Sequence, residues 1–143
     1  MMKRVFYAFA VAALCLLTAC GGKDKPGKDE AKASDIAGVW ELSDIVTKAS
    51  IGTVQVSVYI DFTSDGKFSL YQKLGEGRYT KYTGTFALEK GVLSGNYSDG
   101  KAWGPYNASV DKTSLTLEKE GGKETDVYRK IDAVPAEVTS NLY

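Results

Sequence analysis

The clearest pattern in the chain is an alternation of apolar and polar residues over residues 53–63. A period of two predicts a β-strand that turns one face toward a core. The apolar face carries Val54, Val56, Val58, Ile60 and Phe62. Asp65-Gly66 follows, and a second alternating segment begins at Phe68. Because Asp-Gly between two such segments is a strong turn signal, we predict a β-hairpin here.

Similar short segments, separated by turn residues, fill the chain up to residue 131. The predicted strands cover residues 39–47, 53–63, 68 onward, 78–88, 92–97, 103–110, 114–118 and 124–131. No stretch among them has a helical period, and Pro135 argues against a long closing helix because proline interrupts helical hydrogen bonding. Eight successive antiparallel strands close best as an up-and-down barrel, which removes exposed strand edges. The predicted fold class is therefore an all-β, eight-stranded antiparallel barrel.

The start of the chain has a different character. Lys3 and Arg4 precede an apolar run over residues 5–16, and the small-residue segment Leu17-Thr18-Ala19-Cys20 follows. This order is typical of a secretory signal, and the run is shorter than the roughly 20 residues that span a membrane. We predict a signal peptide over residues 1–19. Residues 20–35 lack aromatic side chains and are rich in charged residues, glycine and alanine, which predicts a flexible tether.

The segment Leu17-Thr18-Ala19-Cys20 resembles the lipobox of bacterial lipoproteins. The resemblance implies cleavage before Cys20, a diacylglycerol on its thiol and anchoring in a membrane; an ordinary signal peptide with a chance cysteine is the alternative. Gly21 after the cysteine is similar to lipoproteins sorted to the outer membrane, with the periplasmic or the surface side left open. Since Cys15 would be removed and Cys20 acylated, we expect no disulfide.

Composition excludes several classes of function. Lysine plus arginine and aspartate plus glutamate both number 18, so no excess of basic residues favours a nucleic-acid partner. The chain has no histidine, and its remaining cysteine would be acylated, which leaves no histidine-assisted nucleophile and no His/Cys metal site. Asp65 and Asp99 precede glycines and are typical of turns. We expect a protein that is not an enzyme and needs no metal or cofactor; its oligomeric state stays open.

Three motifs occur in order along the predicted barrel: Gly38-Val39-Trp40, then Phe-x-x-Asp-Gly-x-Phe over residues 62–68, then Tyr-x-Gly-x-Phe over residues 82–86. Together they resemble the lipocalins, and residues 36–131 resemble the short lipocalin-like lipoproteins of Gram-negative bacteria. The resemblance implies that Gly38 and Trp40 form the closed base of the barrel beneath a basic residue of the last strand, for which Arg129 is the candidate. The Thr-Asp-Tyr motif expected between the sixth and seventh strands is replaced by residues 110–113. Residues 132–143 form a C-terminal tail.

The connections between strands predict where the barrel opens. Alternate connections of a meander lie at the same end, and one set is tight: residues 64–67, 89–91 and 111–113. The other set, residues 48–52, 74–77, 98–102 and 120–123, is longer or richer in glycine and should surround a mouth. The apolar and aromatic residues near this set are Ile51, Tyr71, Tyr79, Tyr97, Trp103 and Tyr106.

Aromatic residues with polar ends suit a pocket that is partly exposed to solvent. We therefore predict that the mouth binds a small, partly apolar ligand. Two alternatives stay open. The same side chains would fill a small barrel that serves as an envelope or protein-interaction module, or exposed tyrosines would bind carbohydrate.

Overall fold

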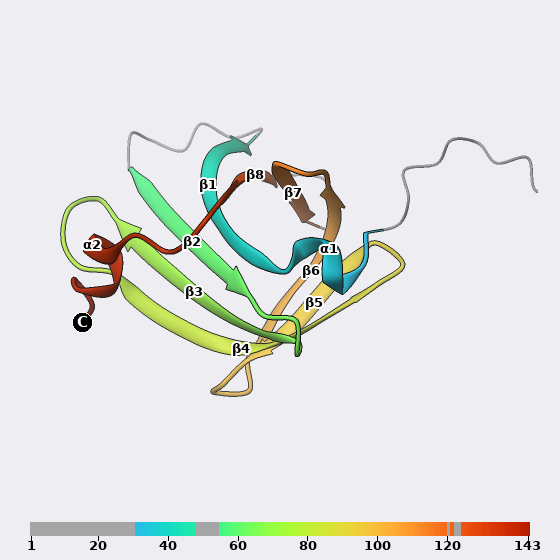
Figure 1. Cartoon of the computed structure of the whole chain (residues 1–143), viewed down its shortest axis with the longest axis horizontal. Coiled ribbons are helices and arrows are strands. Elements are labelled where there is room, and N and C mark those ends of the chain that lie inside the picture. The colour runs from blue at the N-terminus through green and yellow to red at the C-terminus, as the bar shows by residue number, and fades with distance from the viewer. Residues whose placement is uncertain (1–30, 48–54, 120, 122–123) are drawn as a thin grey trace, which may run out of the picture.

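The structure is a computed structural model that describes residues 31–47, 55–119, 121 and 124–143. Its strands are β1 (Gly38–Thr47), β2 (Val56–Phe62), β3 (Lys67–Leu74), β4 (Thr80–Glu89), β5 (Val92–Tyr97), β6 (Ala102–Val110), β7 (Ser114–Lys119) and β8 (Glu124–Ile131). Each strand pairs antiparallel with the next, and β8 pairs with β1, which closes the barrel (Figure 1). The predicted fold class is confirmed. In the described part of the chain, no helix is long and apolar enough to cross a membrane.

Alternation along the strands builds the core. Val58, Ile60 and Phe62 of β2 are buried inside the barrel, as the sequence predicted. They pack with inward-facing residues of the other strands, among them Leu93, Leu115 and Leu117. Burying apolar side chains on the closed inner face provides most of the driving force for this fold.

Trp40 lies at the end of the barrel where the chain enters. It is fully buried, and its indole Nε1 donates a hydrogen bond to the backbone oxygen of Ile36, at 2.8 Å. Ile36 ends the short helix α1 (Ala33–Ile36) and is also fully buried. The buried Ala31 and most of α1 lie within residues 20–35, the segment predicted as the tether.

Lys130, and not Arg129, lies over this tryptophan. Lys130 pairs with Trp40 across the β1–β8 ladder, and its Nζ lies 5.4 Å from the centre of the Trp40 ring. Arg129 is one residue away and therefore points outward, where its Nε donates to Oε2 of Glu41 at 2.7 Å. Gly38 leaves room for the lysine, because a Cβ there would lie 3.1 Å from Lys130 Cε. The prediction of Arg129 was wrong by one position.

The C-terminal segment covers the outer face of β2, β3 and the start of β4. It contains the short helix α2 (Ala136–Thr139), whose Val138 is fully buried against Tyr59, Tyr71 and Tyr79. The backbone nitrogen of Tyr79 donates to Asn141, at 2.9 Å, and the nitrogen of Tyr143 donates to Tyr79, at 3.1 Å. This cluster is separate from the barrel core. The helix is four residues long, in line with the effect expected of Pro135.

The strands are staggered, and this changes where the connections lie. Gly84 of β4 pairs with Phe68, near the start of β3, and with Tyr97, the last residue of β5. The turn before β3 and the loop after β5 therefore flank the same part of β4, although the sequence argument put them at opposite ends. In Figure 1 the turn between β3 and β4 lies at the left, and the loop between β5 and β6 lies at the bottom. The assignment of residues 98–102 to a common mouth was wrong.

Candidate functional site

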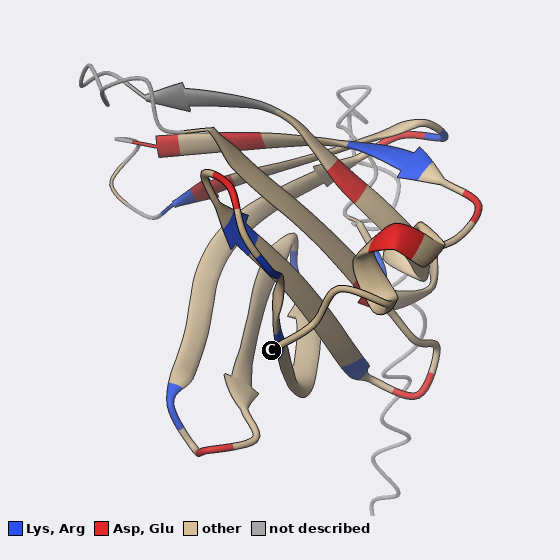
Figure 2. Ribbon diagram, turned by 90° about the vertical axis from the view of Figure 1, so that its left-hand side faces the viewer, with Lys and Arg blue, Asp and Glu red and all other residues tan. Residues whose placement is uncertain are grey.

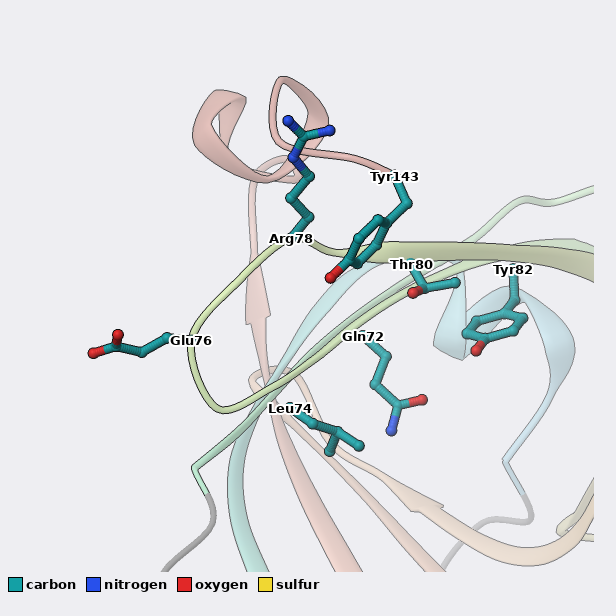
Figure 3. Close-up of a pocket in the computed structure, with 7 residues that line it drawn as sticks. All are labelled: Gln72, Leu74, Glu76, Arg78, Thr80, Tyr82 and Tyr143. Carbon is teal, nitrogen blue, oxygen red and sulfur yellow. The ribbon is translucent and has the colours of Figure 1, made fainter.

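A hollow opens on the inner face of β3 and β4, where these two strands extend beyond the packed core. Leu70 and Phe86 of these strands face the core, so Gln72, Thr80 and Tyr82 lie on the same inner side. The hollow has a volume of about 220 Å³. Its lining residues are Gln72, Leu74, Glu76, Arg78, Thr80, Tyr82 and Tyr143 (Figure 3). Figure 3 shows the Tyr143 ring between Arg78 and Thr80, while Glu76 points away from the others.

Exposed apolar side chains gather in this hollow. In the described part of the chain, the large hydrophobic residues that are exposed are Leu74 (61%), Tyr82 (41%), Val92 (38%) and Tyr143 (84%). Three of these four line the hollow. Apolar groups that gather in a concavity beside a few polar groups are typical of a ligand site.

A continuous row of aromatic rings leads from the hollow into the barrel. The ring centroids are 5.7 Å apart for Tyr82 and Tyr97, and 5.8 Å apart for Tyr97 and Phe68. Phe68 stacks on Trp103 at 4.8 Å, and Trp103 meets Tyr106 at 5.3 Å. We call these five residues the aromatic wall. The wall runs from an exposed ring to the buried Trp103, which is 5% exposed.

Two backbone features make the aromatic wall possible. A Cβ on Gly84 would lie 2.8 Å from the Phe68 ring and 2.1 Å from the Asn96 backbone oxygen, so only glycine fits there. The β5–β6 ladder shifts register, pairing Leu93 with Tyr106 but Gly95 with Trp103. Because of this bulge, Trp103 and Tyr106 both join the barrel core although three positions separate them.

Asp126 of β8 lies near the inner end of the aromatic wall. It shares the inner side of β8 with Tyr128, is half-buried, and its Oδ1 has no hydrogen-bond partner in the described part of the chain. Burial, and next the charge of Glu124, raise the pKa of Asp126 from 3.8 to about 6, against the opposing effect of Lys119. Burial is also the main reason that the pKa values of Tyr106 and Tyr128 are raised, with the charge of Asp126 adding to both.

Neither charged patches nor metal-binding residues indicate another site in the described part of the chain. Figure 2 shows acidic and basic residues interspersed over the side that faces the viewer. Among the described residues, no group of three or more histidine, cysteine, aspartate or glutamate residues could hold a metal ion.

The family follows from the sequence match. Residues 36–117 match the family model of the lipocalin-like domain. The chain belongs to this family. No curated protein shows a significant match to it.

Two solved structures share the fold of this lipocalin-like domain. One is a lipocalin-like protein from Bacteroides uniformis, with a TM-score of 0.54 and 23% identity over 68% of this chain and 99% of that chain. The other is the lipoprotein YedD from Klebsiella pneumoniae, with a TM-score of 0.52 and 10% identity over 78% of this chain and 87% of that chain. At these identities the likeness concerns the fold.

The lipocalin-like domain brings together some of the predicted site residues and separates others. Tyr97, Trp103 and Tyr106 lie together, although Trp103 is buried in the core instead of at a rim. Tyr71 and Tyr79 belong to the outer cluster beneath the C-terminal segment, so their grouping with the other three was wrong. Side chains alternate between the two faces of a strand, and at Tyr71 in β3 and Tyr79 before β4 this alternation turns them to the outside of the barrel.

Two of the predicted site residues lie in parts of the chain that the structure does not describe, and two residues near the site were not predicted. Ile51 and Cys20, the predicted lipidation residue, lie outside the described residues. Sequence reasoning missed Tyr82 as a site residue and missed Asp126 altogether. The signal for Asp126 was its spacing of two from Tyr128, which predicts that a carboxyl and a core tyrosine share one face.

Proposed function

We propose that this lipocalin-like protein binds a small, partly apolar molecule in the hollow and along the aromatic wall. The proposal rests on the fact that the hollow and the aromatic wall meet at Tyr82. Exposed apolar residues line the hollow, and the rings that begin at Tyr82 continue into the barrel. Monomeric proteins rarely gather exposed apolar side chains without a use for them. Gln72, Thr80 and Arg78 supply the few polar groups that would orient a ligand.

A titration of matched variants tests this proposal. Candidate fatty acids, sterol-like molecules, small aromatics and sugars are titrated by calorimetry into the wild type, Tyr82→Ser and Val92→Ser. Val92 is the matched control, because it is an exposed apolar residue outside the hollow. We expect Tyr82→Ser to weaken binding by about three- to tenfold and Val92→Ser to leave it unchanged. Equal effects of the two substitutions would contradict the site.

One observation favours a second function. Trp103 packs tightly between Phe62 and Phe68, with ring centroids at 6.0 and 4.8 Å, so this part of the interior is filled. A filled barrel suits an envelope or protein-interaction module. Absence of saturable binding for every candidate would favour that module, and binding of sugars alone would favour carbohydrate recognition on Tyr82 and Tyr143.

We also propose that the protein is a lipid-anchored envelope lipoprotein that does not act as an enzyme. The lipobox resemblance around Cys20 supports the anchor, and the fold is shared with a solved lipoprotein. Cys20→Ala should abolish metabolic labelling with a radioactive fatty acid and release the protein from the membrane fraction. Continued labelling of that variant would contradict the anchor.

A further inference from the structure

The carboxyl of Asp126 lacks a partner inside the barrel. Its Oδ1 is buried and accepts no hydrogen bond in the described part of the chain, although the side chain as a whole is only half-buried. A buried acceptor without a partner costs folding free energy, and native proteins rarely keep one without a use. The Oδ1 atom is covered, but the side chain as a whole is partly exposed, so a charged group beside the exposed part would lie close to the carboxylate.

The groups that face Asp126 come from several strands. Tyr128 and Glu124 lie on the same side of β8, and Lys119 comes from β7. Tyr106 of β6 is also close enough to sense its charge. On β1, the residue paired with Asp126 is Ile45, which is uncharged. Among the described residues, the two carboxylates outnumber the single lysine, so these groups carry a net negative charge.

The inner end of the aromatic wall lies near this carboxyl. Tyr106 is the wall's inner end; burial raises its pKa, and the charges of Tyr97 and Asp126 add to the rise, so both groups lie near it. A carboxylate beside aromatic ring faces attracts a cation, since the ring quadrupole and the negative charge act in the same direction. An anionic group would instead meet like charge in a half-buried setting, which is unfavourable.

We propose that the ligand carries a cationic amine, which lies against the exposed part of the Asp126 side chain while its apolar part lies along the aromatic wall. This inference rests on the proposed binding function and narrows it. It selects amines over fatty acids, whose carboxylates would meet Asp126 and Glu124. An amine at the exposed edge of the carboxyl would also form a charge-assisted hydrogen bond with it.

Three probes of nearly equal shape test the charge of the ligand: 2-phenylethylamine, 2-phenylethanol and phenylacetate. Their affinities are measured by calorimetry at pH 8 and pH 5 with the full chain. At pH 8 we expect the amine to bind at least about tenfold more tightly than the alcohol, and phenylacetate to bind most weakly. At pH 5 the amine preference should fall, because Asp126, with a pKa raised to about 6, is then mostly protonated.

Two variants locate the effect. In Asp126→Asn the ratio of amine to alcohol affinity should fall to about one, since the charge is removed with little change of shape. Glu118→Gln is the matched control: it removes an exposed carboxylate from the outer face of the neighbouring strand β7, and the preference should stay. If Asp126→Asn does not fold, the wild-type pH dependence decides, and an affinity ratio that is equal at pH 5 and pH 8 would overturn the inference.

The outcomes separate this inference from the proposed function. An alcohol that binds as tightly as the amine, or an Asp126→Asn variant that keeps the preference, would overturn the amine and leave ligand binding in place. Failure of all three probes, together with failure of every candidate in the broader titration, would overturn both.

Discussion

Asp126 makes the stability of the protein depend on pH in an unusual direction. Its pKa rises from 3.8 to about 6 on folding, so between these values the folded chain binds more protons than the unfolded chain. The free energy of unfolding should therefore fall as the pH rises through this window. Urea unfolding from pH 3.5 to pH 7.5 should show Asp126→Asn gaining stability relative to the wild type from about pH 4 to about pH 6, with a constant difference above.

Asp111 provides the opposite case as a control. The backbone nitrogens of Thr113 and Ser114 donate hydrogen bonds to its carboxylate, at 2.8 and 2.7 Å, and lower its pKa. Its stabilising contribution should be present at neutral pH and be lost as the pH falls. Asp111→Asn should therefore be less stable than the wild type at pH 7. Parallel curves for the two variants would contradict the assignment of Asp126.

The contact between Trp40 and Lys130 should contribute measurably to stability. Trp40→Ala removes a fully buried ring and should lower the free energy of unfolding by about 3–5 kcal/mol. In a double-mutant cycle measured by urea unfolding, Trp40→Leu and Lys130→Met should couple by about 0.5–1 kcal/mol, the value of an exposed cation–π contact. Arg129→Met is the control and should be additive with Trp40→Leu, because Arg129 binds Glu41. Coupling to Arg129 instead would contradict this arrangement.

The C-terminal segment should contribute to the stability of the fold through α2. Val138 of α2 is fully buried between the tyrosines of the outer cluster, so Val138→Ala should lower the free energy of unfolding by about 1–3 kcal/mol. Glu137→Ala changes the exposed neighbour on the same helix and should stay within about 0.5 kcal/mol of the wild type. Urea unfolding checks both. A neutral Val138→Ala would mean that the segment contributes little to the fold.

Strand positions were predictable from the sequence, but the outer layer was not. Each strand boundary predicted from the period of two lies within about three residues of the observed boundary. The prediction works because a strand with one buried face must alternate apolar and polar residues. The same pattern could not assign Tyr59 and Tyr71, which are buried on the outer face. Their partner, Val138, lies far along the chain in a segment without strand or long helix period, and alternation carries no information about such contacts.

At the scale of the whole molecule, the stagger of the strands limits what a sequence reveals. The lengths of the connections suggested that the loops form two sets at opposite ends of the barrel. However, Gly84 pairs with Phe68 at the start of β3 and with Tyr97 at the end of β5, so loops from both sets lie beside the same part of β4. Barrel closure requires such a stagger, and its size depends on all eight pairings together. Trp103 was therefore predicted near a rim and lies in the core, where it contacts Phe62 and Phe68.

The proposed lipid anchor would fix how the protein is oriented at a membrane. The chain enters the barrel at α1, and Asp35 of that helix lines a hollow together with Lys112, whereas Glu76 lies at the turn between β3 and β4. In Figure 1 these two regions lie on opposite sides of the barrel. With the proposed anchor at Cys20, the predicted tether of about a dozen residues would reach roughly 20 Å, less than the roughly 33 Å spanned by the 10 residues of β4.

The barrel should therefore spend most of its time with α1 toward the bilayer and the hollow facing away. Spin labels on cysteines at Lys112 and Glu76 of the lipidated protein in vesicles should be relaxed unequally by nickel-chelating lipids, with the stronger effect at Lys112. Both side chains are exposed, so the difference would reflect distance from the membrane and not burial. Equal relaxation would mean that the tether lets the barrel turn freely, and the hollow would then have no fixed orientation to the membrane.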